Sequence, residues 1–312
     1  MKTVLTGGAA LRRVYTDDTI GKIARLSGEE PEICGGIRPD TEAVFTTWGM
    51  RSYDADHIQR NFPALKYIFY GAGTVQSFAR PFLQRGVRIF SAWQANGVPV
   101  AEFTVSQIIL CGKRYFDIFT GVKGTPRGNY GLKVGIIGLG TIGRLVCRML
   151  SEYKLDVYAY DKFLPDEEFD RLGVKRAGLE QIFSECDVIS NHLANNAQTR
   201  GMLDRRLLFM MKPDAYFINT GRGAQVDHQA LYDVLCDSPY RTALLDVTDP
   251  EPLPEDHPLK KCGNAIISPH IAGSLGDEVG RMGEYMCEEF GRIVSGAEPL
   301  FEVTEAMLAV MA

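Results

Sequence analysis

The chain has 312 residues, of which 45% are hydrophobic and 23% charged, and its formal net charge is −5. This length predicts about two domains, and the composition is that of an ordinary globular protein. Charges of both signs are spread along the sequence, so we expect no nucleic-acid partner. No stretch approaches the roughly 20 apolar residues of a membrane span, and the N-terminus lacks the apolar run of a signal peptide.

The seven cysteines are widely scattered and form no Cys-x-x-Cys pair. This distribution favours free thiols over a disulfide framework or a zinc site. We therefore expect a cytoplasmic protein with no bound metal.

Short apolar runs alternate with helical stretches, which is the pattern of parallel sheets covered by helices. A first series of candidate strands comprises Thr3–Leu5, Ala43–Thr46, Tyr67–Phe69 and Arg88–Phe90. A second series comprises Lys133–Ile137, Asp156–Tyr160, Val188–Ser190, Tyr216–Asn219, Ala243–Asp246 and Ala265–Ile267. We predict an α/β protein with two domains, each a doubly wound parallel sheet.

A long apolar stretch, Ala101–Gly121, separates the two series and predicts a buried linking helix. The Gly-, Pro- and Asn-rich segment Gly121–Gly131 is typical of a loop, and near the end Asp277–Ser295 predicts a helix followed by a short segment, Phe301–Met311. We expect residues 1–98 and 275–312 to form one domain, into which residues 99–274 are inserted as the second.

A glycine-rich loop follows the first strand of the second series. Gly138, Gly140 and Gly143 form the pattern G-x-G-x-x-G between the strand Lys133–Ile137 and a predicted helix that includes Arg144–Leu150. In this pattern the first glycine permits a tight turn, the second lets the backbone approach a pyrophosphate, and the third lets helix and strand pack closely. The helix N-terminus offers free N–H groups to the phosphates.

Asp161 ends the next strand, about 20 residues after the glycines, where an acid can bind the hydroxyls of an adenosine ribose and repel a 2′-phosphate. The neighbouring Lys162 leaves NADP as an alternative, but the acid favours NAD. The alternative without a ligand is a glycine-rich turn with Asp161 as a helix cap.

Arg222 lies between Gly221 and Gly223 after the strand Tyr216–Asn219. Open α/β sheets bind ligands at the carboxyl ends of their strands, where a guanidinium can hold a carboxylate bidentately and polarise an adjacent carbonyl. The alternative is a surface arginine or a partner of a helix C-terminus.

His270 follows the strand Ala265–Ile267, and Glu251 stands between Pro250 and Pro252. Histidine can give or take a proton near physiological pH. A carboxylate partner would orient the ring and favour its charged form. If the two side chains do not meet, Glu251 is an ordinary loop acid and His270 a solvated or structural residue.

Together these sequence motifs resemble those of the family of NAD-dependent D-2-hydroxyacid dehydrogenases, which includes phosphoglycerate dehydrogenase and glyoxylate/hydroxypyruvate reductase. The similarity is strongest from Pro99 to Ser274 and weak in the first hundred residues. Further stretches agree, including Ile189–Leu193, Thr199–Leu203 and Pro252–Leu259. The resemblance implies Rossmann-like and flavodoxin-like domains with the active site in the cleft between them.

The resemblance also implies a role for each residue of these phrases. Arg222 would bind the carboxylate and carbonyl of a 2-keto acid, and His270, with Glu251 as its partner, would be the general acid and base. Residues expected to contact NAD are Gly138, Gly140, Thr141, Ile142, Gly143, Asp161, His192, Thr220, Gly221, Asp246, Ile271, Ala272 and Gly273. We expect a homodimer formed through the helix at 101–121.

The chain departs from the family at Gly71–Gln76, where many relatives read Gly-x-Asp-Asn-Val-Asp. Backbone N–H groups of Ala72 and Gly73 would still meet a substrate carboxylate, and Trp48 could border the same pocket. The substrate therefore cannot be named by analogy. Because the sequence stops at Ala312, we expect no C-terminal regulatory extension.

Two other functions have a similar fold. Formate dehydrogenases carry Gln where this chain has Glu251, which argues against that activity. NAD-sensing proteins like the C-terminal-binding corepressors share the three residues, but no interaction tail or disordered arm is visible. We predict an NAD(H)-dependent oxidoreductase that interconverts a 2-keto acid and a D-2-hydroxy acid, with the corepressor type as the alternative.

Overall fold

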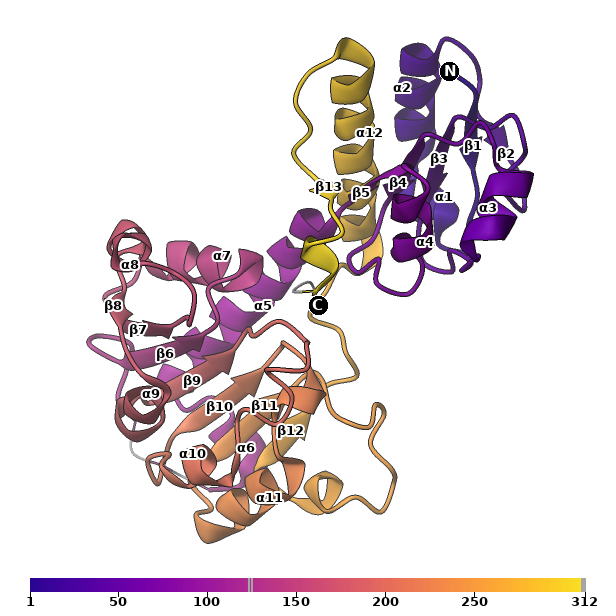
Figure 1. Cartoon of the computed structure of the whole chain (residues 1–312). Helices are drawn as coiled ribbons and strands as arrows, with labels where there is room; N and C mark the ends of the chain where they lie inside the picture. Colours follow the sequence, from indigo (N-terminus) through magenta and orange to yellow (C-terminus); the bar gives the residue numbers. More distant parts are fainter. Residues whose placement is uncertain (123, 125, 310–312) are drawn as a thin grey trace. The chain divides into compact units, whose positions relative to one another are not determined.

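The computed structural model describes residues 1–122, 124 and 126–309. It consists of two compact units: Met1–Gly97 with the residues from Ser274 onward (unit 1), and Val98–Gly273 (unit 2). The junctions lie one residue before the boundaries expected from the sequence (Figure 1). None of the helices in the described ranges is long and apolar enough to cross a membrane.

Unit 1 is built on a six-stranded sheet with the order β13-β5-β4-β3-β1-β2. Its strands are β1 (Thr3–Leu5), β2 (Glu32–Ile33), β3 (Ala43–Thr46), β4 (Tyr67–Tyr70), β5 (Arg88–Ser91) and β13 (Glu302–Val303). The predicted strands β1, β3, β4 and β5 pair in parallel, as expected, and so does β2, but β13 is antiparallel to β5. The two-residue strands β2 and β13 escaped prediction because an apolar run that short gives no periodicity.

Helices cover both faces of this sheet. Its helical segments are α1 (Leu11–Val14), α2 (Asp17–Ser27), α3 (Ala55–Asn61), α4 (Ala79–Gln84), η3 (Gly276–Glu278), α12 (Val279–Ser295) and η4 (Met307–Ala309). Phe45, Phe69 and Phe90, on neighbouring strands, stack at 4.8 and 4.9 Å, and Phe290 of α12 meets the first two edge-on. Alternate residues such as Val44 face α3 and α4 on the other side. Burial on both faces explains the continuous apolar strands.

Unit 2 contains a seven-stranded, wholly parallel sheet with the order β12-β11-β10-β9-β6-β7-β8. Its strands are β6 (Lys133–Ile137), β7 (Asp156–Tyr160), β8 (Lys175–Arg176), β9 (Val188–Asn191), β10 (Tyr216–Asn219), β11 (Thr242–Leu245) and β12 (Ala265–Ile267). After β6 the chain adds β7 and then β8 on one side of β6. It then crosses back and adds β9, β10, β11 and β12 on the other side. Such a reversal is the point where doubly wound sheets bind ligands.

The unit 2 sheet also has an apolar core on each face. One core packs against α5 (Trp93–Gly112), α7 (Thr141–Leu150) and α8 (Asp166–Leu172), and the other against α9 (Leu179–Glu185), α10 (Arg205–Phe209) and α11 (His228–Asp237). Two short 3₁₀ segments, η1 (Gly223–Gln225) and η2 (Pro258–Lys261), complete the unit.

The linking helix differs from its prediction. Helix α5 spans Trp93–Gly112 with Pro99 inside it, and a separate short helix, α6, spans Asp117–Thr120. The helix breaks because Arg114 has φ of 56° and its guanidinium binds Asp117 and the carbonyls of Asp214 and Tyr240. Within the predicted loop 121–131, residues 123 and 125 lie outside the described residues, as do 310–311 of the predicted last segment.

Candidate active site

The glycine-rich loop joins β6 to α7 and leaves an open cradle for a ligand. Gly138 has φ of +91°, and a Cβ there would lie 2.8 Å from the carbonyl oxygen of His192. A Cβ on Gly143 would lie 2.0 Å from the Gly138 carbonyl, so both positions require glycine. A Cβ on Gly140 would instead meet no atom within 4 Å. No side chain caps α7 at Gly140, so the first N–H groups, including those of Thr141 and Ile142, are available to an anion.

Asp161 lies just beyond the end of β7, beside this loop. Its carboxylate accepts hydrogen bonds from the backbone N–H groups of Leu139 and Phe163, each at 2.9 Å. These contacts fix the carboxylate against the glycine loop, and each oxygen keeps a lone pair for a ligand hydroxyl. The cradle and the acid together fit a dinucleotide with an unphosphorylated ribose.

Arg222 follows β10 at the carboxyl end of the sheet, where it is half-buried. Its guanidinium donates to the Gly221 carbonyl at 2.7 Å, and no carboxylate in the described part of the chain pairs with it. Burial lowers the pKa of Arg222, and the negative charge of Glu251 opposes that shift. Since a guanidinium stays protonated in proteins, Arg222 presents an uncompensated cation to a ligand.

His270 and Glu251 meet, as the sequence predicted they could. His270 Nδ1 lies 2.5 Å from Glu251 Oε1, and the two side chains are 47% and 39% exposed. His270 itself has φ of 55°, a left-handed conformation that is uncommon outside glycine. The paired ring nitrogen leaves Nε2 free to exchange a proton with a ligand.

Asp246 holds the loop that carries His270. This residue is 2% exposed and directly follows β11. Its carboxylate accepts from the hydroxyl of Ser268 at 2.6 Å and from the backbone N–H groups of Ile271 and Ala272 at 2.9 and 2.8 Å. Sequence reasoning gave Asp246 only a cofactor contact, and it missed Ser268. The polar ends of two adjacent apolar strands were the available signal.

His192 and Thr220 also lie at carboxyl ends of strands, and both are buried. Burial lowers the pKa of His192 to about 4, so its ring is neutral at physiological pH. The ring bonds to the Ser190 hydroxyl at 2.9 Å, and the His192 backbone packs under Gly138. The Thr220 hydroxyl pairs with that of Thr104 at 3.1 Å. His228 is also buried.

The predicted substrate loop lies in unit 1, after β4. Ala72 is fully buried, and its N–H donates to the Tyr70 carbonyl at 2.8 Å. The Ser91 hydroxyl lies within hydrogen-bond distance of the carbonyls of Ala72 and Gly73, which are thereby turned inward. Across the described residues, the N–H of Gly73 meets no acceptor. Trp48, after β3, is 41% exposed.

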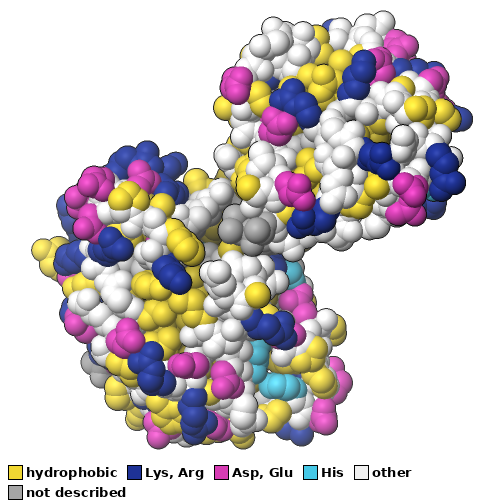
Figure 2. Space-filling view, viewed as in Figure 1, with side chains coloured by type: hydrophobic (Ala, Val, Ile, Leu, Met, Phe, Trp, Pro, Cys, Tyr) yellow, Lys and Arg dark blue, Asp and Glu magenta, His cyan; other side chains and the backbone are white. Residues whose placement is uncertain are grey.

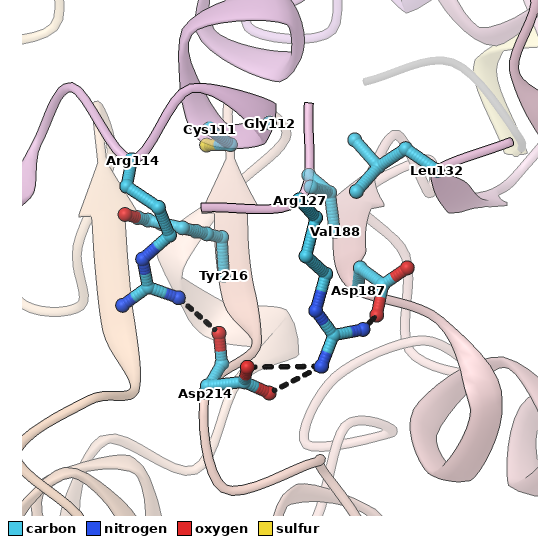
Figure 3. A pocket seen from close by; sticks show the side chains of 9 residues that line it. All are labelled: Cys111, Gly112, Arg114, Arg127, Leu132, Asp187, Val188, Asp214 and Tyr216. Carbon is cyan, nitrogen blue, oxygen red and sulfur yellow. Dashed lines mark hydrogen bonds and ion pairs between the residues drawn. The ribbon is translucent and has the colours of Figure 1, made fainter. Parts of the chain in front are cut away.

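A second polar cluster lies at the opposite ends of β9 and β10. Figure 3 shows Arg127 pointing at the carboxylates of Asp187 and Asp214, and Arg114 at the Asp214 carbonyl. Because each guanidinium is already neutralised or hydrogen-bonded, this cluster joins segments of the chain and offers no ligand site. Nor do the described residues contain a group of His, Cys, Asp and Glu side chains suited to a metal ion.

Known proteins share both the sequence and the fold. Residues 120–272 match the NAD binding domain of D-isomer specific 2-hydroxyacid dehydrogenases. A D-3-phosphoglycerate dehydrogenase of Methanocaldococcus jannaschii is 28% identical over 68% of this chain and 42% of its own length. A glyoxylate reductase of Thermofilum pendens is 31% identical over 68% of this chain and 66% of its own.

A solved structure extends the likeness to nearly the whole chain. The NAD complex of a D-isomer specific 2-hydroxyacid dehydrogenase from Lactobacillus delbrueckii ssp. bulgaricus has a TM-score of 0.78 at 22% identity, covering 97% of this chain and 100% of that one. It supports the fold, while the sequence matches support the family. This chain belongs to the D-isomer specific 2-hydroxyacid dehydrogenase family and carries its NAD-binding domain in unit 2.

Proposed function

We propose that this protein is an NAD(H)-dependent dehydrogenase that interconverts a 2-keto acid and a D-2-hydroxy acid. The observation that carries the proposal is the His270–Glu251 pair, joined at 2.5 Å at the same carboxyl edge of the sheet as the uncompensated cation of Arg222. A carboxylate-binding cation and an oriented acid–base group are what reduction of a keto acid requires.

Each residue has a distinct part in this proposal. Bound NADH supplies the hydride that reduces the keto carbon. Arg222 holds the substrate carboxylate and carbonyl oxygen, and it balances the negative charge that grows on that oxygen. His270 donates the proton that completes the alcohol, and in the reverse reaction it accepts that proton. Glu251 orients the ring through its hydrogen bond to Nδ1.

We further propose which residues bind the cofactor. We assign the pyrophosphate to Gly138, Gly140, Gly143 and the N–H groups of Thr141 and Ile142, and the ribose to Asp161. Around the nicotinamide we place His192, Thr220, Gly221, Asp246, Ile271, Ala272 and Gly273. Asp161 supports NAD over NADP, because its carboxylate repels a 2′-phosphate.

The test is turnover by purified protein with NADH and a panel of pyruvate, glyoxylate, hydroxypyruvate and phenylpyruvate. We expect NADH oxidation with at least one of them, D-configuration wherever the product is chiral, and weaker activity with NADPH. NADH binding without turnover of any 2-keto acid would instead support an NAD-sensing regulator. The relatives above support the enzyme, since both are named as a dehydrogenase or a reductase.

The substrate-reading residues form a separate proposal. In unit 1 the open N–H of Gly73 supports a contact with the substrate carboxylate, with the buried Ala72 holding the turn. We expect the exposed ring of Trp48 to limit the size of the substrate side chain. Trp48→Ala should then raise activity on phenylpyruvate relative to pyruvate, and an unchanged ratio would remove Trp48 from the proposal.

We also propose a homodimer whose contact includes α6. In this segment Ile118 and Phe119 are 73% and 63% exposed, which is costly for a free surface. By contrast, the face visible in Figure 2 mixes charges of both signs with scattered apolar side chains. Light scattering should give a dimer for the wild type and a monomer for Ile118→Glu with Phe119→Glu. A monomeric wild type would contradict the proposed dimer.

We also propose a cytoplasmic location, which the seven free cysteines support.

A further inference from the structure

Three side-chain amides are fully buried at the carboxyl end of the unit 2 sheet. Asn191 ends β9, Asn219 ends β10, and Gln225 ends η1 just beyond Arg222. Polar groups removed from water cost free energy unless every donor and acceptor finds a partner. The partners of these amides therefore indicate what the cluster holds in place.

Gln225 uses its full hydrogen-bonding capacity. Its Nε2 donates to the carbonyls of Leu193 and Ala194 at 2.7 and 2.9 Å. Its Oε1 accepts from Asn191 Nδ2 at 2.6 Å and from the backbone N–H of Arg222 at 3.2 Å. The amide cannot be reversed, because its NH₂ would then face two donors. These four hydrogen bonds therefore fix the orientation of the Gln225 side chain.

The cluster binds the backbone on both sides of the Arg222 Cα atom. Asn219 Oδ1 accepts from the N–H of Gly221 at 3.1 Å, and Asn219 Nδ2 donates to the carbonyl of Arg222 at 3.1 Å. Asn191 ties the two halves together by donating to both Asn219 and Gln225. A Cβ on Gly221 would lie 3.0 Å from Gln225 Oε1, so glycine is needed for this close approach.

The contacts from Gln225 connect the Arg222 turn to a neighbouring strand's loop. Leu193 and Ala194 follow β9, whereas Arg222 follows β10. The guanidinium itself has only one partner among the described residues, the Gly221 carbonyl. Its direction therefore depends on a backbone that the amides hold, and an apolar residue at position 225 would leave the Arg222 N–H without an acceptor.

We propose that Gln225, together with Asn191, is a positioning residue that aims Arg222 at the substrate carboxylate. This inference rests on the proposed function of Arg222. Displacing a substrate-binding group by about 1 Å can cost on the order of 100-fold in rate. Hydrogen-bond partners that orient metal-binding side chains typically account for about 10- to 100-fold in activity, and we expect an effect of the same order for Gln225. Gln225 makes no hydrogen bond to the glycine-rich loop after β6, so its loss should change NADH affinity far less than kcat/KM.

The test compares Gln225→Met with Gln229→Met. Gln229 lies exposed on α11, where its amide donates to Asp233, so the control makes the same chemical change at a site away from Arg222. In the first variant kcat/KM for the best 2-keto acid should fall about 10- to 100-fold, with the dissociation constant of NADH unchanged. Hydrogen exchange at the amides of Gly221 and Arg222 should accelerate. The control should match the wild type in all three measurements.

A double variant separates positioning from stability. Asn191→Leu with Gln225→Met removes both partners of the Asn191–Gln225 hydrogen bond, so the losses of thermal midpoint in the two single variants should be less than additive. We expect kcat/KM to remain low. If activity recovers together with stability, or if the single variant loses NADH affinity in the same proportion as kcat/KM, positioning is overturned.

The two proposals fail in different ways. A wild-type protein that turns over no 2-keto acid contradicts the proposed function. A wild type that does turn over, beside a Gln225→Met variant with unchanged kcat/KM and unchanged exchange at Arg222, contradicts the role of Gln225.

Discussion

Unit 2 sets its two chemical groups in opposite kinds of surroundings. Arg222 lies half-buried after β10, with amides that are fully buried bonded to its backbone. His270 and Glu251 lie on exposed loops after β12 and β11, and the Asp246 carboxylate binds the His270 loop through Ser268, Ile271 and Ala272. A group that balances charge gains from a fixed, poorly solvated position, whereas a proton donor must also exchange its proton with water between turnovers.

The largest loss of activity is expected for a change at Arg222, the half-buried group of this comparison. Replacing Arg222 with Gln removes the half-buried, uncompensated cation after β10, so kcat/KM for the keto acid should fall about 10²–10³-fold. Steady-state kinetics with the best substrate of the panel measures it. Arg206→Gln, which breaks an exposed pair with Glu180, is the matched control and should retain activity. Equal effects of the two changes would refute a special role for Arg222.

Asp246 holds the exposed loop that carries His270, and Asp246→Asn should lose an intermediate amount of activity. An amide offers one acceptor oxygen where the carboxylate offers two, so the N–H of Ile271 or Ala272 loses its partner. We expect kcat to fall about 10- to 100-fold and the free energy of unfolding to fall by about 1–3 kcal/mol. Kinetics and urea unfolding measure the two effects, and hydrogen exchange at Ile271 should accelerate. A variant with native exchange at that amide would show that Asp246 does not hold the loop.

Glu251→Gln should cost less, because the loop geometry survives. The amide can still hydrogen-bond the ring of His270, but it places no negative charge beside the ring that donates the proton. We expect kcat to fall about 10-fold with NADH affinity unchanged. Glu255→Gln, on the same loop but paired with Lys260, is the control. An effect of Glu251→Gln no larger than that of the control would leave His270 without a functional partner.

The last prediction concerns stability rather than activity, and its subject is the buried side chain of His192. Its pKa falls from 6.5 in the unfolded chain to about 4 in the folded one, because burial disfavours the charged ring. The unfolded state therefore binds the proton first, and stability should decline by up to about 3 kcal/mol as the pH falls from 6.5 to 4. His192→Gln should flatten that decline in urea unfolding at pH 7 and pH 5. Identical slopes in both proteins would contradict the burial argument.

Much of the fold could be predicted from apolar runs, because strands buried on both faces are continuous in sequence. Glycines and acids at strand ends likewise marked the cofactor loop and Asp161. Prediction failed where packing decides. Helix α5 contains Pro99 and ends at Gly112, where Arg114 finds partners distant in sequence.

The site shows the same division. Arg222, Glu251 and His270 stand in recognisable phrases, and the structure brings the last two together. The roles of Gln225 and Ser268 depend on contacts between strands, which a single sequence does not display. A polar residue in a buried segment was the only available signal, and it names no partner.

The proposed role of His270 is to supply the proton from its exposed loop, while other residues of unit 2 bind the cofactor. Its most direct test is single-turnover reduction of a 2-keto acid by the NADH complexes of the wild type and His270→Ala, with His257→Ala as the control. We predict a rate lower by about 10²–10⁴-fold in His270→Ala, with NADH affinity kept. Reduction by His270→Ala at the wild-type rate would contradict the account.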